Sequence, residues 1–579
     1  MGQWSSETCV VAYGSILSAE LDSAPSRKER GAFFTPPQVA DFLADFAVKR
    51  KEDRVLEPAA GEAVFISAVA SRLSGLGASG TDIRAQVEGY ELHGASAAAA
   101  RERLGNQGID VGIHVGDFFE MPPRATFDAV VGNPPYIRYQ SFTGRQRAIA
   151  REDALRAGVR LGALASSWAA FTVHATQFLR EGGRLAFVLP AELLSVNYAA
   201  PVRRYLLSSF SSVCLVLFED PIFPEVQEEV ILLLADGFGL GSSDALLLQQ
   251  VRSLDELGKN CSNLLPVSGD ERWPIGPDGH LAQRYLHELD ASAFSSLSEW
   301  GRVRLGAVTG ANSFFALSQE GARDHGLPPQ DLLPLCPPGS RHLRGLSIGE
   351  EDLRLLAAAG RRTCLFYPLE PLDAPSRAYV SYGEERGVAN AYKCRVRKPW
   401  WRVPGLRVAD LFLTYMNGYA PSLCSNDIGV YHLNSVHGVF LDSDKRSVGM
   451  RLLPMLMHST PALLSAEQYG RSYGGGLLKL EPREALRIAV PSSSFVDSHC
   501  GCLAPLRREV SAALRAGDRG TATAVVDEAL LGLGAVGPRA MAQMAKLLRS
   551  LRDRRYRRGR GVHALPAHDA RSVLDGAGG

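Results

Sequence analysis

The feature that most constrains the fold is an alternation of short apolar runs and helix-length segments between residues 31 and 236. Apolar runs at 55–56, 87–91, 113–115 and 127–131 are each followed by a turn or a longer segment. Strands that alternate with helices at this spacing are typical of a parallel sheet with helices on both faces. The pattern predicts a doubly wound, mostly parallel α/β sheet. Further strands are predicted at 184–189, 213–218 and 230–234.

The alternation ends at a Gly/Ser-rich break, residues 237–243, where we place a domain boundary at residue 240. Beyond it, turn-rich stretches separate short segments, which predicts a second, mixed α+β domain with a helical C-terminal segment. The expected division is an N-terminal extension at 1–30, domains at 31–240 and 241–500, a basic helical segment at 501–560 and a disordered tail at 561–579.

The charge of the chain is divided unevenly. Its 63 basic and 62 acidic residues give a net charge of +1. Residues 1–240 hold 22 basic and 28 acidic residues, whereas 241–579 hold 41 and 34. The overall neutrality therefore does not argue against a nucleic-acid partner, because a positive second half suits phosphates.

Composition also narrows the class of protein. The nine cysteines are scattered and odd in number, which disfavours a disulfide framework or a zinc site. No apolar run reaches the ~18 residues of a membrane span, and no signal peptide is evident. We expect a cytoplasmic protein without a membrane partner and without a metal.

Two segments carry the chemistry. In the first, the strand at 55–56 enters a small-residue turn that lets a ligand approach the backbone at a helix N-terminus. Glu91, at the end of the next strand, can accept hydrogen bonds from a ribose diol. A routine strand–helix turn with a solvated carboxylate is the alternative.

The second segment is Asn133-Pro134-Pro135-Tyr136, after a buried strand. The Asn133 amide oxygen and the Pro134 carbonyl form two acceptors suited to one NH2 group, and Tyr136 offers a face for a planar base.

These segments resemble the amino-methyltransferases that use S-adenosylmethionine. The closest resemblance is to the N6-adenine DNA methyltransferases of the Taq and Eco57I type, the modification enzymes of type II restriction–modification systems. Their gamma-class order places cofactor motifs first, then Asn-Pro-Pro-Tyr, then a target-recognition domain. The matching segments are Gly31–Pro36, Glu57–Phe65, Tyr90-Glu91, Gly116–Phe118, Asn133–Tyr136 and Ile222–Pro224.

The resemblance implies a Rossmann-like catalytic domain at 31–240, a DNA target-recognition domain at 241–500 and a role for each matched residue. By this resemblance, the methionine part of the cofactor is expected to bind Thr35, Glu57, Ala59 and Gly61. The ribose is expected to bind Glu91, and the adenine ring of the cofactor to bind Asp117 and Phe118. The target adenine is expected to bind Asn133, Pro134, Tyr136 and Phe223. Ala63 departs from the family, which usually has glycine there, and its methyl group should crowd the turn only slightly.

In the second half, residues 391–410 hold six basic residues among tryptophans and prolines. Cations beside rigid aromatic rings suit a nucleic-acid surface, although a solvated loop with tryptophans in the core is the alternative. The expected DNA-binding residues are Arg395, Arg397, Lys398, Trp400, Trp401, Arg402 and Arg471. The basic run at 541–560 is either a solvated tail or a set of further phosphate contacts.

The predicted activity is site-specific methylation of N6 of an adenine flipped out of double-stranded DNA, by a monomer that protects host DNA from a cognate restriction endonuclease. An N4-cytosine target and an RNA or protein amino-methyltransferase remain alternatives, because all present a planar NH2 group. A fused nuclease is a third, disfavoured by the short segment before Gly31 and by the lack of a clear Asp…Glu-x-Lys cluster.

Overall fold

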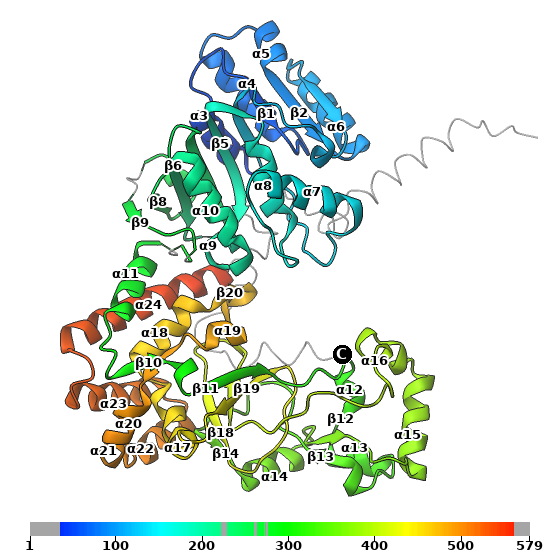
Figure 1. Cartoon of the computed structure of the whole chain (residues 1–579), viewed down its shortest axis with the longest axis vertical. Coiled ribbons are helices and arrows are strands. Elements are labelled where there is room, and N and C mark those ends of the chain that lie inside the picture. The colour runs from blue at the N-terminus through cyan, green and yellow to red at the C-terminus, as the bar shows by residue number, and fades with distance from the viewer. Residues whose placement is uncertain are drawn as a thin grey trace, which may run out of the picture. The chain divides into compact units, whose positions relative to one another are not determined.

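The computed structural model describes residues 35–220, 222, 229–259, 263–270, 272–273 and 276–560. It divides into two compact units, one extending to residue 280 and one covering residues 281–560 (Figure 1). The expected extension at 1–30, the tail at 561–579 and Phe223 lie outside the described residues. No helix in the described ranges is both long and apolar enough to cross a membrane.

The first unit is built on a nine-stranded sheet of order β3-β2-β1-β4-β5-β7-β6-β8-β9. The first five strands run parallel to one another, and β7 is antiparallel to both β5 and β6. This confirms the predicted doubly wound, mostly parallel sheet. The strands are β1 (Val55–Glu57), β2 (Val87–Glu91), β3 (Gly112–Val115), β4 (Phe127–Gly132), β5 (Leu179–Pro190), β6 (Phe210–Phe218), β7 (Val230–Phe238), β8 (Ala245–Val251) and β9 (Asn263–Pro266).

Helices connect the strands, and their apolar faces join the sheet in one core. Among them α8 is buried along its whole length, because nearly every side chain in it is apolar or small. The helices are α3 (Pro37–Ala47), α4 (Val64–Gly75), α5 (Gly80–Gln86), α6 (Gly94–Asn106), α7 (Gly144–Arg156), α8 (Ser167–Thr176), α9 (Glu192–Ser195) and α10 (Ala200–Ser209).

The sheet continues past the boundary expected at residue 240. Strand β8 pairs in parallel with β6, and β9 pairs with β8. Gly237 and Gly239, at φ 73° and 76°, form part of the turn between β7 and β8. The Gly-rich break is therefore a connection within one unit, and the compact unit ends about 40 residues later, at residue 280.

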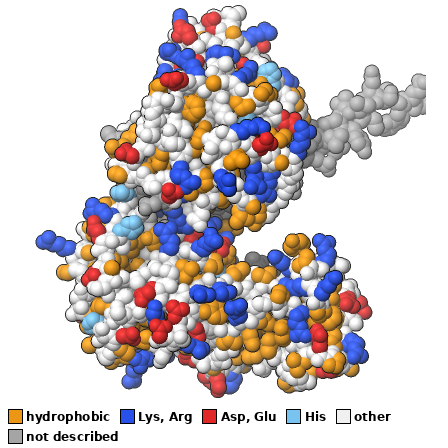
Figure 2. Space-filling model, in the orientation of Figure 1, with side chains coloured by type: hydrophobic (Ala, Val, Ile, Leu, Met, Phe, Trp, Pro, Cys, Tyr) orange, Lys and Arg blue, Asp and Glu red, His pale blue; other side chains and the backbone are white. Residues whose placement is uncertain are grey.

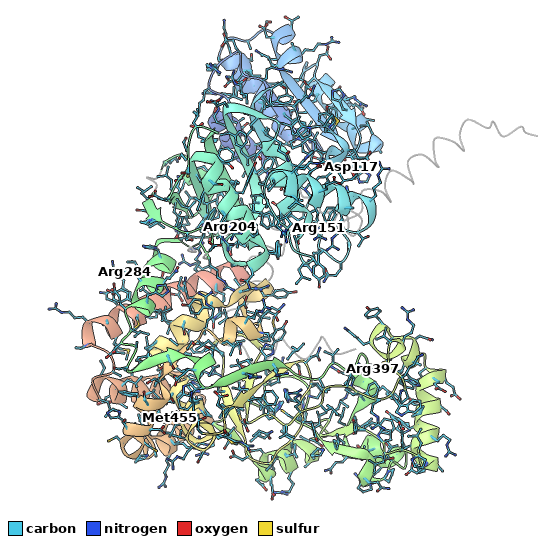
Figure 3. The ribbon with its side chains drawn as sticks, viewed as in Figure 1. Asp117, Arg151, Arg204, Arg284, Arg397 and Met455 are labelled. Carbon is cyan, nitrogen blue, oxygen red and sulfur yellow. The ribbon has the colours of Figure 1, made fainter. Side chains whose placement is uncertain are left out.

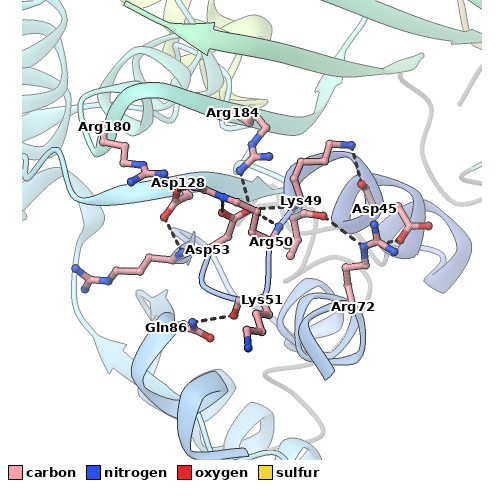
Figure 4. Close-up of polar contacts among 12 residues, drawn as sticks. Asp45, Lys49, Arg50, Lys51, Asp53, Arg72, Gln86, Asp128, Arg180 and Arg184 are labelled. Atoms are coloured by element: carbon pink, nitrogen blue, oxygen red, sulfur yellow. Dashed lines mark hydrogen bonds and ion pairs between the residues drawn. The ribbon is translucent and has the colours of Figure 1, made fainter. Parts of the chain in front are cut away.

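An ion-pair cluster ties three strands together at the amino edge of the sheet (Figure 4). Arg184 of β5 donates to Asp53, which precedes β1, over 2.7 Å, and both side chains are almost fully buried. Arg50 bridges Asp53 and Asp128, the second residue of β4, at 3.1 and 3.0 Å. Arg180 also pairs with Asp128. This cluster fixes the order β1-β4-β5 at the edge opposite the strand ends that carry the motifs.

The second unit has the predicted mixed α+β character. Its largest sheet has the order β11-β19-β16-β18-β14, and smaller sheets have the orders β12-β15-β13, β17-β21-β20 and β10-β22. The strands are β10 (Phe294–Ser296), β11 (Gly301–Leu305), β12 (Ala316–Leu317), β13 (Leu332–Pro334), β14 (Ser347–Ile348), β15 (Cys364–Phe366), β16 (Leu411–Thr414), β17 (Met416–Asn417), β18 (Leu423–Asn426), β19 (Val436–Leu441), β20 (Arg471–Tyr473), β21 (Leu477–Lys479) and β22 (Ala489–Pro491). The helices include α12 (Asn312–Phe315), α15 (Ala374–Glu385), α16 (Tyr392–Arg395), α17 (Arg446–Leu456), α18 (Thr460–Tyr469), α22 (Leu506–Arg515), α23 (Arg519–Gly532) and α24 (Pro538–Arg560).

The basic run at 541–560 is not a solvated tail. It lies in α24, whose Arg552, Arg554 and Arg555 are buried. Arg555 donates to the Glu467 carboxylate of α18 over 2.8 and 2.9 Å and to backbone carbonyls that include that of Gly418. Arg552 also pairs with Glu467, so it and Arg555 hold the helix on the core of the second unit, and their guanidinium groups are not available as phosphate contacts.

Candidate active site

The two chemistry-bearing segments meet at the carboxyl edge of the first sheet. Strand β1 lies between β2 and β4, with Val55 opposite both Val87 and Ala129. Because parallel strands end at the same edge, the residues that follow β1, β2 and β4 lie next to one another. This brings the turn after Glu57, the carboxylate of Glu91 and the loop of Asn133 to one place.

The turn after β1 is held by Glu91. One carboxylate oxygen accepts the Gly61 N–H over 2.9 Å, and the other accepts the His93 N–H over 3.0 Å. The Ala60 N–H also donates to the Tyr90 carbonyl over 2.7 Å. Each Glu91 oxygen keeps a second lone pair, so the residue can still accept from a ligand hydroxyl.

At Ala63 the structure shows a backbone effect, where the sequence predicted slight crowding by the methyl group. It has φ 58°, and within the described ranges it is the one residue other than glycine with a positive φ. A left-handed conformation costs a residue with a Cβ about 1–2 kcal/mol, whereas glycine adopts it freely. The family's glycine at this position is therefore explained by the backbone conformation at the start of α4, rather than by crowding of the turn.

Glu57 is a buried carboxyl group in this turn, 2% exposed. It accepts the Ile66 N–H in the first turn of α4 over 3.0 Å. Burial raises its pKa well above the ordinary value, and the charge of Glu91 raises that pKa further against the hydrogen bond from Ile66. Within the described residues no cationic side chain pairs with it. A ligand ammonium group would supply the missing counter-charge.

The residues after β3 occupy two different environments. The Asp117 carboxylate accepts the Phe119 N–H over 3.0 Å and stays partly exposed (labelled in Figure 3). The Phe118 ring is 4% exposed and packs against Phe171 and Phe178, with centroid distances of 5.1 and 4.9 Å. Asp117 is therefore positioned for a ligand contact, whereas the Phe118 ring belongs to the core.

Asn133 presents an amide with one partner and one free acceptor. Its Nδ2 donates to the Thr35 hydroxyl over 3.3 Å, which sets the orientation of the amide. Its Oδ1 is buried and has no hydrogen-bond partner in the described part of the chain. Nor does any hydrogen bond from a described residue reach the Pro134 carbonyl. Both acceptors are therefore free to accept a hydrogen bond from a ligand.

Tyr136 and Ser167 fix the loop that carries these acceptors. Tyr136 is 8% exposed, and its hydroxyl donates to the Val188 carbonyl of β5 over 3.0 Å. The fully buried Ser167 hydroxyl donates to the Pro135 carbonyl and accepts the Ile137 N–H over 2.8 Å. Sequence reasoning missed Ser167, because a serine before an apolar helix resembles an ordinary N-cap.

Part of the expected DNA-binding segment of the second unit packs within the chain. Arg397 donates to the carbonyls of Val308 and Thr309, the latter over 2.7 Å, and so joins the turn before α12 to the segment after α16. Arg402 pairs with Glu370 over 3.1 Å. Arg397 and Arg402 therefore have structural partners within the chain.

The other residues expected to bind DNA include some that have partners within the chain and some that are exposed. Trp400 donates to Glu384 of α15 over 3.0 Å, and Trp401 is half-buried beside it. Arg471 pairs with the buried Glu484 over 2.6 Å. Arg395 and Lys398 are exposed. These two cations are the members of the expected set that face outward.

The sheet order, the acid at the end of β2 and the Asn-Pro-Pro-Tyr loop after β4 define an amino-methyltransferase. A family model described as N-6 DNA Methylase matches residues 12–237, and one described as Type II methyltransferase M.Eco57I, C-terminal domain, matches residues 281–531. The chain therefore belongs to the N6-adenine DNA methyltransferases that act as modification enzymes of type II restriction–modification systems. The second match begins where the second compact unit begins.

Individual relatives extend over most of the chain. Type II methyltransferase M.AccI of Acinetobacter calcoaceticus is 22% identical over 80% of this chain and 85% of its own length. Type II methyltransferase M.XamI of Xanthomonas campestris pv. amaranthicola is 26% identical over the same shares. Among solved structures, the type IIL restriction-modification enzyme MmeI in complex with DNA has a TM-score of 0.54 at 14% identity, over 90% of this chain and 75% of that one, which is a likeness of fold.

Proposed function

We propose that this enzyme transfers a methyl group from S-adenosylmethionine to N6 of an adenine flipped out of double-stranded DNA, at a specific site, and so protects host DNA from a cognate endonuclease. The observation that carries the proposal is the unpaired, buried Oδ1 of Asn133 beside the Pro134 carbonyl. We further propose that it acts as a monomer in the bacterial cytoplasm, where its DNA substrate lies.

The residues at the carboxyl edge fit this cofactor. The buried Glu57 carboxylate suits the amino group of the methionine part, and we assign Thr35, Ala59 and Gly61 to the same part of the cofactor. Glu91 suits the ribose hydroxyls and Asp117 the adenine amino group. When bound, S-adenosylmethionine supplies a methyl group on a positively charged sulfur.

The chemical task of the protein is to make a poor nucleophile react. The lone pair of an adenine amino group is delocalised into the ring. When Asn133 Oδ1 and the Pro134 carbonyl each accept one amino hydrogen, they draw the nitrogen toward tetrahedral geometry and localise that lone pair. Fixing the amino group in line with the methyl group supplies much of the rate enhancement. Asn133 is not a base, so the proton leaves to water after transfer.

Base flipping follows from this geometry, because N6 cannot reach a buried acceptor while the base is stacked. Unstacking costs a few kcal/mol. Stacking of the flipped base on Tyr136 and Phe223 would offset about 1–3 kcal/mol per base. The hydrogen bond from Tyr136 to Val188 holds that ring in place before DNA arrives.

Nucleoside analysis tests the proposal. The purified protein is incubated with DNA and labelled cofactor, and the DNA is digested to nucleosides. We expect N6-methyladenine at mapped, sequence-specific positions. N4-methylcytosine, labelled RNA or labelled protein would each refute the proposed substrate, since the two-acceptor clamp by itself accepts any planar NH2 group.

A further inference from the structure

A closed loop leaves the Asn-Pro-Pro-Tyr motif and returns to it. The Ile137 N–H donates to the Ser167 hydroxyl over 2.8 Å, and the Ser167 N–H donates to the Ile137 carbonyl over 3.0 Å. Residues 138–166, which we call the excursion, therefore begin and end at one point, directly after the motif. Any surface on the excursion is held at a fixed position relative to Asn133.

The excursion is folded rather than loose. It contains α7, whose Ala150, Asp153 and Ala154 are buried, and Val159 and Leu161 beyond the helix are buried as well. These side chains pack the excursion on the core of the first unit. The opposite side of α7 faces outward.

The excursion is positively charged in an otherwise acidic half of the chain. Its acids are Glu152 and Asp153, and Arg156 pairs with both, over 2.6 and 2.8 Å. The acids are thus largely neutralised within the helix. The arginines of the excursion are Arg138, Arg145, Arg147, Arg151, Arg156 and Arg160.

Two of these arginines share one hollow on the surface. Arg151 and Arg160 line a hollow of about 370 Å³ with Ala148, Leu155, Leu161 and Glu152, whose carboxylate is the one paired with Arg156. Within the described residues no ion pair joins either guanidinium group to an acid. Figure 3 labels Arg151 at α7, and Figure 2 shows Lys and Arg side chains gathered on this part of the unit. Exposed guanidinium groups without an acidic partner are the groups that bind phosphates in a duplex.

We propose that the excursion is a DNA-backbone contact of the catalytic unit itself, in which Arg151 and Arg160 bind phosphates of the duplex beside the flipped adenine. The inference rests on the proposed function, since it takes DNA as the substrate. It goes beyond that function by assigning a phosphate-binding surface to the acidic half of the chain, where the charge balance predicted none. We call the pair of hydrogen bonds between Ile137 and Ser167 the neck. The neck joins the DNA-binding surface of the excursion to the motif in one rigid element.

The test is the salt dependence of DNA binding by Arg151→Gln/Arg160→Gln. Each phosphate contact contributes about 0.9 to the slope of log K against log salt, so losing two reduces the slope by about 1.8. Between 50 and 200 mM salt, the affinity of the variant should consequently fall about twelve-fold less than that of the wild type. Cofactor affinity, measured by calorimetry, reports that the unit is folded.

Lys51→Gln/Arg84→Gln is the matched control. It removes the same charge from exposed positions next to the amino ends of β1 and β2, at the edge opposite the motifs. Its slope should equal that of the wild type. An unchanged slope in Arg151→Gln/Arg160→Gln, with DNA still methylated by the wild type, overturns this proposal alone. A wild type that methylates no DNA overturns the proposed function instead.

Discussion

Replacing Ser167 by alanine should slow methyl transfer although the side chain is far too buried to touch either substrate. Its hydroxyl makes two hydrogen bonds, one to the Pro135 carbonyl and one from the Ile137 N–H. Ser167→Ala leaves both backbone groups without a partner, at about 1–3 kcal/mol each. We therefore expect the free energy of unfolding to fall by about 2–4 kcal/mol.

The effect on catalysis comes from the same two bonds. Without them, the two acceptors of Asn133 and Pro134 are held less firmly. Removing one preorganised group from a reacting centre costs about 10²–10³ in rate, which sets an upper bound for loosening one. We expect a fall of about ten- to a hundred-fold in the single-turnover rate of methyl transfer at saturating DNA and cofactor.

Ser465→Ala separates catalysis from stability. Ser465 is also fully buried, and its hydroxyl donates to the Ala462 carbonyl and accepts the Ala489 N–H, both over 2.9 Å, in the second unit. It should lose comparable stability in urea unfolding but transfer methyl groups within about threefold of the wild-type rate. If both variants lose the same transfer rate, or neither does, the positioning role of Ser167 is wrong.

The remaining predictions concern single groups. Asn133→Ala should lower methyl transfer by at least about 10² while DNA and cofactor still bind, and retained transfer would contradict the clamp. Because the pKa of Glu57 is raised, cofactor affinity should increase as pH rises through that pKa. In calorimetry, Glu57→Gln should remove this pH dependence and weaken cofactor binding about tenfold or more. The same substitution should stabilise the free protein at pH values above the ordinary glutamate pKa. Burial opposes the ionisation of Asp53, but the Lys49 N–H, Arg184 and Arg50 hold its pKa below the usual value. Asp53→Asn should thus cost about 3 kcal/mol in urea unfolding at neutral pH, and the difference should shrink as pH falls through that lowered pKa. Arg395→Gln/Lys398→Gln should flatten the salt dependence of DNA binding without a loss of thermal stability, and an unchanged slope would remove both from the phosphate surface.

The sequence was sufficient where local pattern determines structure. The apolar runs at 55–56, 87–91 and 127–131 predicted three strands of a mostly parallel sheet, and the structure makes them neighbours. The break at 237–243 misled, because glycines with positive φ serve a turn inside a sheet as well as they serve a linker. Pairing of β8 with β6 is a long-range contact that no local pattern reports.

Charge was the least predictable property. Arg397, Arg402 and Arg555 have the same composition signal as exposed cations, yet their guanidinium groups bind carbonyl and carboxylate oxygens within the chain. An arginine can donate to a phosphate, a carboxylate or a backbone carbonyl, so its neighbours in space decide which of them it binds. The individual roles of the cofactor-binding and target-binding residues stay predictions that the variants above test.

The two hydrogen bonds between Ile137 and Ser167 make the outward side of the excursion a replaceable surface. The side chains that pack the excursion on the core, among them Ala150, Ala154, Val159 and Leu161, have to be kept. Changes on the outward side of α7 should consequently leave Asn133 in place. An engineer could exchange the exposed side chains of α7 for others that contact DNA, and evolution could vary them, while the buried framework that carries the motif stays unaltered.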